Sequence, residues 1–222
     1  MSEAARRYRT SAPATVLECR RVDPDLQLLE RWRQGETAAG EALFARYVDR
    51  LCAFFATKCP GEADDLVQRT LMACVRARDQ FRAESSFRTY LYTVARNELY
   101  QFLRTRQRDG ARLDYSVTSM AELVTTPVTR MARDSERRRI VEALRTLPVE
   151  QQTLLELHYW EELDAAALAE VFATNPGAIR VRLHRARAAL RARLAPEADD
   201  PALDALVRSG DSSGNPGRDP GL

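Results

Sequence analysis

The stretch NPGAIRVRLHRARAALRARL (residues 175–194) contains six arginines and no acidic residue. Asn175 is a typical helix N-cap, and Pro176 suits the first helical position, where a missing N–H costs nothing. The apolar residues that follow recur at steps of three and four: Ile179, Leu183, Ala186, Leu190 and Leu194. This spacing predicts a helix with one apolar face that packs on a core, while the arginines lie on its two flanks.

The residues just before this helix predict a helix-turn-helix motif. A second helix is expected over residues 164–172, and the short turn at 173–175 has the length that joins the helices of such a motif. Residues 135–175 carry four basic and eight acidic residues, so positive charge is concentrated on the last helix. This segregation favours a polyanion-binding surface over a solvated helix face. In a recognition helix, N-terminal side chains reach base edges and flanking arginines hold phosphates.

The overall charge of the chain does not by itself indicate a nucleic-acid partner. The net charge of the 222 residues is only +2, so a binding surface for DNA has to be local. Arginine supplies 33 of the 34 basic residues, and Lys58 is the only lysine. A GC-rich codon usage explains this bias more simply than selection for arginine chemistry.

Composition argues against metal, cofactor and membrane proteins. The four cysteines form no CxxC pair and only two histidines are present, so we expect no metal site, no cofactor and free, mostly buried thiols. The first thirty residues lack a signal-peptide core, and no apolar run approaches the ~18 residues of a membrane span. We therefore expect a cytoplasmic protein without stable membrane insertion.

Helical periodicity extends over most of the chain. Apolar residues recur at three- and four-residue steps from 25 to 106, and this pattern lapses between 107 and 133. No segment shows strand periodicity, so the sequence predicts an all-α fold of two small helical domains joined by a flexible linker, the C-terminal one a helix-turn-helix. The expected parts are a flexible N-terminal extension at 1–22, a first domain at 23–106, a linker at 107–134, a second domain at 135–195 and an acidic, mostly disordered tail at 196–222.

The last part of the first domain combines basic and aromatic residues. Arg82, Arg88 and Arg96 are interleaved with rings such as Phe87 and Tyr90. This combination suits single-stranded DNA, because arginine binds the backbone and an exposed ring stacks a base for roughly 1–3 kcal/mol. Most of these rings could instead belong to the helical core, which is the interpretation that we favour for Phe87 on the apolar stripe.

Two blocks of the sequence resemble a known family. The block EADDLVQRTLMACVRARDQFRAESSFRTYLYTVARNELYQFLRTRQR (residues 62–108) is similar to the core-binding and promoter-melting region of extracytoplasmic-function (ECF) sigma factors, the small initiation subunits of bacterial RNA polymerase. The block ALRTLPVEQQTLLELHYWEELDAAALAEVFATNPGAIRVRLHRARAALRARL (residues 143–194) resembles their promoter-reading region. The resemblance covers roughly 25–106 and 135–194, in the order of the family. It implies that 23–106 is sigma region 2 and 135–195 is sigma region 4.

The resemblance also implies roles for individual residues. Contact with core RNA polymerase is expected from Asp64, Asp65, Gln68 and Arg69. Binding and melting of the −10 element is expected from Arg82, Ser85, Ser86, Arg88, Tyr90, Arg96 and Asn97. Reading of the −35 element is expected from Arg180, Arg182, His184, Arg185 and Arg187. The chain departs from the family at Arg69, where an acid is usual, and at Val181, where a small polar residue is usual.

The family implies a function without bond chemistry. The expected partners are core RNA polymerase, promoter DNA and an anti-sigma factor, which often holds such proteins at the membrane. A DNA-binding regulator that acts without polymerase is the alternative, and a gel shift without core enzyme distinguishes the two. An enzyme is disfavoured because the sequence shows no nucleophile–base arrangement, no Gly-rich phosphate loop and no metal-ligand spacing.

Overall fold

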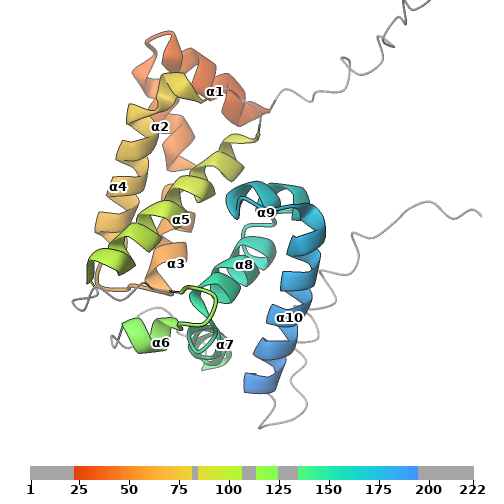
Figure 1. Ribbon diagram of the computed structural model, residues 1–222. Helices are drawn as coiled ribbons and strands as arrows, with labels where there is room; N and C mark the ends of the chain where they lie inside the picture. The colour runs from red at the N-terminus through yellow and green to blue at the C-terminus, as the bar shows by residue number, and fades with distance from the viewer. Residues whose placement is uncertain (1–22, 82–84, 107–113, 125–134, 195–222) are drawn as a thin grey trace, which may run out of the picture.

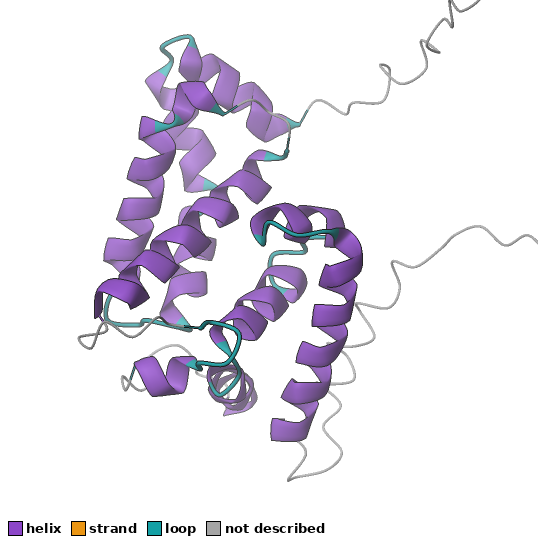
Figure 2. Cartoon of the chain, in the orientation of Figure 1, coloured by secondary structure: helices purple, strands orange, loops and turns teal. Residues whose placement is uncertain are grey.

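The computed structural model describes residues 23–81, 85–106, 114–124 and 135–194, and these residues are almost entirely helical (Figures 1 and 2). The elements of the first part are α1 (Pro24–Arg33), α2 (Thr37–Ala45), α3 (Val48–Ala56), α4 (Ala63–Arg76), the 3-10 turn η2 (Arg78–Gln80) and α5 (Phe87–Arg106). Those that follow are α6 (Met120–Leu123), α7 (Ser135–Arg145), α8 (Val149–Tyr159), α9 (Ala165–Val171) and α10 (Pro176–Leu194). The described part contains no strand, only one isolated bridge, and the predicted all-α class is confirmed.

The first domain is built from α1 to α5. Leucine and aromatic side chains from all five helices form its core, with Leu43, Leu51, Phe55, Leu66 and Leu99 fully buried. Phe87 is also buried, as its place on the apolar stripe suggested. Helix α1 starts at Pro24 because the Asp23 carboxylate caps it by accepting from the backbone N–H of Asp25. The two longest helices of the domain are α4 and α5, and α5 packs against α9 of the second domain (Figure 1).

The second domain contains the helix-turn-helix that the sequence predicted. Asp164 caps α9 by accepting from the N–H of Ala167 at 2.8 Å, and Asn175 caps α10 by accepting from Ala178 at 2.8 Å. Between the two helices Ala173 has a φ of 50°, which turns the chain sharply. The predicted apolar face of α10 is buried at every position: Ile179, Leu183, Ala186, Leu190 and Leu194.

Residues 114–124, part of the expected flexible linker, are packed onto both domains. Tyr115 stacks on Tyr100 of α5 with 4.0 Å between ring centroids, and its hydroxyl donates to the Tyr100 carbonyl at 2.8 Å. Its own carbonyl accepts from the N–H of Glu150, in the first turn of α8, at 3.0 Å. Met120 is fully buried. The apolar side chains of this segment explain the docking, and residues 107–113 and 125–134 lie outside the described part, as do the predicted extension and tail.

The cysteines in the described part are free thiols, as expected. Cys59 and Cys74 are buried and Cys52 is half-buried, whereas Cys19 lies outside the described residues. Burial raises the pKa of the Cys59 thiol to about 11 and that of Cys74 to about 12. These two thiols therefore stay protonated and unreactive at neutral pH.

A substitution at Gly40 of α2 tests the packing of the first domain. A methyl group there would lie 2.8 Å from atoms of the Trp32 indole, which itself packs edge-on against Phe44. Overpacking of this kind costs about 1–3 kcal/mol, which outweighs the ~1 kcal/mol that alanine gains over glycine in a helix. We expect Gly40→Ala to lower the free energy of unfolding, measured by urea denaturation.

The matched control is Gly61→Ala, because a methyl group at Gly61 meets no atom within 4 Å. This variant should unfold at the urea concentration of the wild type or slightly above it. A Gly40→Ala protein as stable as the Gly61→Ala control would show that the indole moves aside at no cost.

Candidate nucleic-acid and polymerase interfaces

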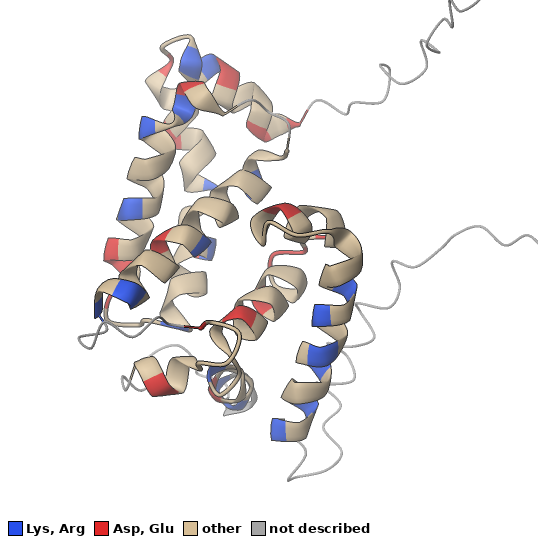
Figure 3. Cartoon of the chain, in the orientation of Figure 1, with Lys and Arg blue, Asp and Glu red and all other residues tan. Residues whose placement is uncertain are grey.

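Helix α10 presents its arginines in a row along the outside of the second domain (Figure 3). Arg180, His184 and Arg185 are exposed, and Arg182 and Arg187 are half-buried. Val181 stands between two of the arginines and is 52% exposed. The five residues expected to read DNA thus all lie on α10 outside the buried seam, Arg182 and Arg187 on its half-buried flanks and the other three exposed.

Arg182 is held by an acidic residue of the same domain. Its guanidinium lies 2.6 Å from the Glu150 carboxylate, in the first turn of α8. A pocket between α8, α10 and the docked segment surrounds this pair and is lined also by Ser116, Leu154 and Arg185. Only one nitrogen of Arg182 is engaged in this bond, so the rest of the guanidinium fork is available to a base or a phosphate. The sequence did not indicate this ion pair, because its members lie 32 positions apart.

The four residues expected to contact polymerase share the exposed face of α4. Asp64, Asp65, Gln68 and Arg69 are all exposed, and Arg69 forms an ion pair with Asp65 at 2.7 Å. The unusual arginine thus neutralises one of the two acids of this face. The face continues into two exposed apolar side chains, Met72 and Val75, which are 46% and 40% exposed.

The helical periodicity of residues 25–106 did not single out Met72 or Val75 as exposed. The buried side of α4 consists of Ala63, Leu66, Val67, Thr70 and Cys74. Val75 follows Cys74 directly and is turned about 100° away from it around the helix, out of the core. An apolar residue outside the 66–70–74 seam is the signal that could have revealed this surface.

The residues expected to bind the −10 strand differ in their exposure and in the residues that they contact. Arg82 lies outside the described residues. Ser86 is exposed and its hydroxyl accepts from the N–H of Thr89 at 3.0 Å, so it caps the start of α5. Ser85 is half-buried beside it, and Asn97 is exposed further along α5.

Tyr90 is a half-buried member of an aromatic cluster. Its ring lies 4.7 Å from that of Phe81 and 6.3 Å from that of Phe87, measured between centroids. Tyr90 is thus packed against other rings and still partly exposed, which suits a fixed ring at a binding surface.

Arg88 and Arg96 are engaged by the second domain. Arg88 donates to the backbone carbonyl of Glu161 at 2.8 Å. The Arg96 guanidinium lies 4.4 Å from the Tyr100 ring and 4.9 Å from the ring of Phe172, which follows α9. Burial raises the pKa of the Glu161 carboxyl, and the nearby guanidinium of Arg50 opposes this rise. Two arginines expected to meet DNA thus lie at the contact between the domains.

Neither a metal cluster nor a membrane-spanning helix is found among the described residues. Among them, no cluster of three or more histidine, cysteine, aspartate or glutamate side chains could hold a metal ion. None of the helices in this part of the chain is long and apolar enough to cross a membrane.

Comparison with known proteins identifies both domains. Residues 43–109 match the model of Sigma-70 region 2, and residues 137–190 match that of Sigma-70, region 4. The two matches together cover more than half of the chain.

Curated relatives extend the similarity over most of the chain. The ECF RNA polymerase sigma-E factor of Haemophilus influenzae is 27% identical over 181 residues, which are 78% of this chain and 96% of that protein. The RNA polymerase sigma-H factor of Pseudomonas aeruginosa is 28% identical over 197 residues, or 84% and 97%.

Solved structures agree with this assignment. The sigma factor RpoE of Bartonella quintana, solved with the anti-sigma factor NepR, superposes with a TM-score of 0.56 at 25% identity and covers 72% of this chain and 98% of its own. CnrH, solved with the cytosolic domain of CnrY, has the same fold, with a TM-score of 0.59 at 23% identity, over 79% of this chain and all of its own. With both regions matched in the family's order, the chain belongs to the sigma-70 family and is a sigma factor of the ECF type.

Proposed function

We propose that the chain binds core RNA polymerase and directs it to a specific set of promoters. The first domain contacts the polymerase and opens the −10 element, and the second domain reads the −35 element with α10. The observation that carries this proposal is the presence on one chain of a family-matched α4–α5 unit and an arginine-lined recognition helix. The chain does no bond chemistry itself, and strand opening is driven by the capture of unstacked bases.

The arginine row of α10 supports the reading of the −35 element. Arg180 and Arg182 lie in the first turns of the helix, where a recognition helix meets base edges in the major groove. Arg185 and Arg187 follow on the flanks, where phosphate contacts fix the register of the helix on the duplex. His184 is exposed between them and adds a further donor at this surface.

The exposed face of α4 supports the contact with polymerase. Two acids, a glutamine and two apolar side chains form a mixed surface of the kind that protein partners bind. A regulator that acts on DNA alone has no use for this face, and this favours the initiation factor over a regulator without polymerase.

The proposal also covers the control of this chain by an inhibitory protein and the compartment in which the chain acts. The two structural relatives were each solved with a binding partner, an anti-sigma factor in the case of RpoE. We infer that an anti-sigma factor also controls this chain. The chain itself acts in the cytoplasm, where polymerase and promoter DNA are present.

Paired surface variants test the division of labour. Arg180→Ala/Arg182→Ala should abolish transcription that depends on the −35 element and leave binding to core polymerase unchanged, since α10 and α4 lie in different domains. Met72→Glu/Val75→Glu should instead weaken binding to core polymerase, and should therefore reduce transcription from every promoter, whether or not it depends on the −35 element. Co-purification with core polymerase and run-off transcription measure the two properties. Removing an arginine that binds a phosphate should also reduce the salt-dependence slope of DNA binding by about one.

The two variants serve as controls for each other. Loss of polymerase binding in the α10 variant, or tight specific DNA binding by the wild-type chain without polymerase, would favour the regulator. Failure of the wild-type chain to bind core polymerase would remove the proposal.

A neutral substitution at Glu150 tests how Arg182 reads DNA. Glu150→Gln removes the charge that holds Arg182 and lies near the DNA-binding face. We expect binding to unrelated DNA to tighten and discrimination between −35 sequences to fall, each by about two- to five-fold, the range of a partly exposed ion pair. Fluorescence anisotropy with matched and scrambled duplexes measures both, using the polymerase-bound protein.

The control is Glu142→Gln on α7, an exposed position with the same change in net charge. It should alter binding to both duplexes equally. An equal effect of Glu150→Gln on both duplexes would mean that Glu150 contributes only charge and does not orient Arg182.

A further inference from the structure

The only lysine of the chain lies buried between the two domains. Lys58 follows the end of α3, and its ammonium donates to the carboxylate of Glu156, on α8 of the second domain. The two side chains are 0% and 1% exposed. The ammonium also donates to the Phe54 carbonyl at 2.9 Å and lies 3.7 Å from the centre of the Phe54 ring. This ion pair therefore joins residues 98 positions apart and exists only while the domains are in contact.

The other hydrogen bonds of the pair involve residues of both domains. Glu156 accepts from the Gln152 side chain at 2.8 Å and from the Thr57 hydroxyl at 3.2 Å. Burial lowers the pKa of Lys58, and the Glu156 carboxylate opposes this effect. A buried ion pair adds little net stability when both partners are present, but removing one partner is strongly destabilising. The pair therefore determines how the two domains are positioned against each other, and it adds little to the net stability of that closed arrangement.

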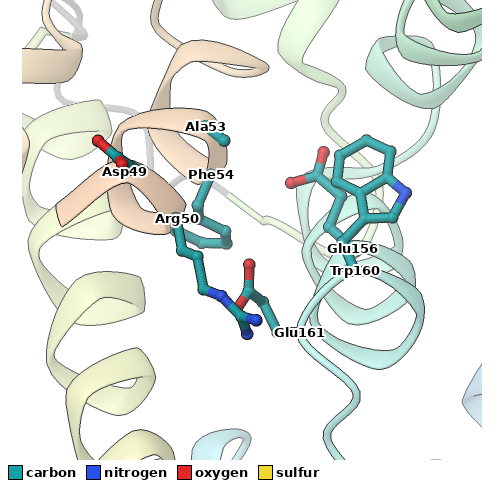
Figure 4. Close-up of a pocket in the computed structure, with 7 residues that line it drawn as sticks. All are labelled: Asp49, Arg50, Ala53, Phe54, Glu156, Trp160 and Glu161. Atoms are coloured by element: carbon teal, nitrogen blue, oxygen red, sulfur yellow. The ribbon is translucent and has the colours of Figure 1, made fainter. Parts of the chain in front are cut away.

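A second group of polar contacts surrounds the pair. Arg145 of α7 donates to the carbonyls of Thr57 and Lys58 at 3.2 and 3.3 Å. On the other side Arg50 of α3 points toward Glu161, 3.4 Å away, across a pocket bordered by Trp160 (Figure 4). Water can solvate these guanidinium, carboxylate and carbonyl groups well when the two domains separate.

The closed arrangement covers part of the surface expected to open DNA. Arg88 is bound to the Glu161 carbonyl, and Arg96 lies against Phe172. Both arginines would have to leave these partners before they could bind a −10 strand. The arginines near the start of α10 remain accessible, so closure affects one DNA surface and spares the other.

We propose that the Lys58–Glu156 pair is the latch of an autoinhibited closed state, in which the second domain covers the −10 surface of the first. Binding to polymerase and promoter DNA opens this state. The identity of the competing ligand, a single −10 strand, rests on the proposed function. The latch itself is a property of the free chain.

The test compares the free full-length wild type with Lys58→Met, which keeps the volume of the side chain and leaves Glu156 buried without its partner. This change should shift the closed–open equilibrium toward the open state by on the order of 100-fold. Small-angle X-ray scattering should show a larger radius of gyration. Binding of a single-stranded oligonucleotide with a −10 sequence should tighten by about ten-fold or more, as the competent state becomes populated.

The double variant Lys58→Met/Glu156→Leu separates loss of the latch from misfolding. An apolar pair of similar volume can replace a buried ion pair without loss of stability, so the double variant should return to the wild-type radius and to weak binding. Arg31→Met, which breaks the exposed pair with Glu36, should behave as wild type. Should Lys58→Met fail to melt cooperatively, Glu156→Gln provides the same test with a smaller change.

The outcomes distinguish this proposal from the proposed function. An unchanged radius in both Lys58→Met and Glu156→Gln would overturn the latch, and so would failure of the double variant to close. Expansion without tighter binding of the strand would overturn the autoinhibitory role, even where the chain still initiates transcription with core polymerase. Failure of wild type and variants to initiate at all would count against the proposed function, while scattering would still decide the latch.

Discussion

The arrangement of the two domains depends on one buried ion pair, formed by the lysine after α3 and a glutamate of α8. An ammonium and a carboxylate without access to water are tolerated only where each finds full hydrogen bonding, and here that bonding comes from both domains at once. This requirement fixes the register of α8 against α3 far more narrowly than apolar packing does. Sliding by one residue would leave a charge without a partner in the interior.

The contact between the domains combines apolar and polar groups. Leucine and aromatic side chains, which have no favourable alternative in water, form one cluster of buried residues that includes both domains. Guanidinium, ammonium, carboxylate and carbonyl groups also meet across this contact, and such groups exchange protein partners for water at a small net cost. The polar part of the contact is therefore the part that water replaces most readily when the domains separate.

The sequence predicted those features of the structure that depend on residues close together in the chain. The helix-turn-helix and the buried face of α10 depend on spacing and caps within about twenty residues, and both were predicted in detail. The exposure of Val75 on α4 was not predicted, because a helix of this composition does not show from its sequence how wide its buried stripe is. Lys58 stood out as the only lysine, but its partner could not be inferred, since ion pairs across 98 positions leave no periodic signal.

The docked segment 114–124 adds a constraint on how the domains can separate. Tyr115 stacks on Tyr100 of α5 and also accepts a bond from Glu150 of α8, so one residue connects both domains. Movement of α8 away from α3 must either break the stacking of the two rings or give up the bond to Glu150. The same Glu150 holds Arg182 of α10 through its side chain. The position of the recognition helix is therefore linked, through a single glutamate, to the segment that any opening must disturb.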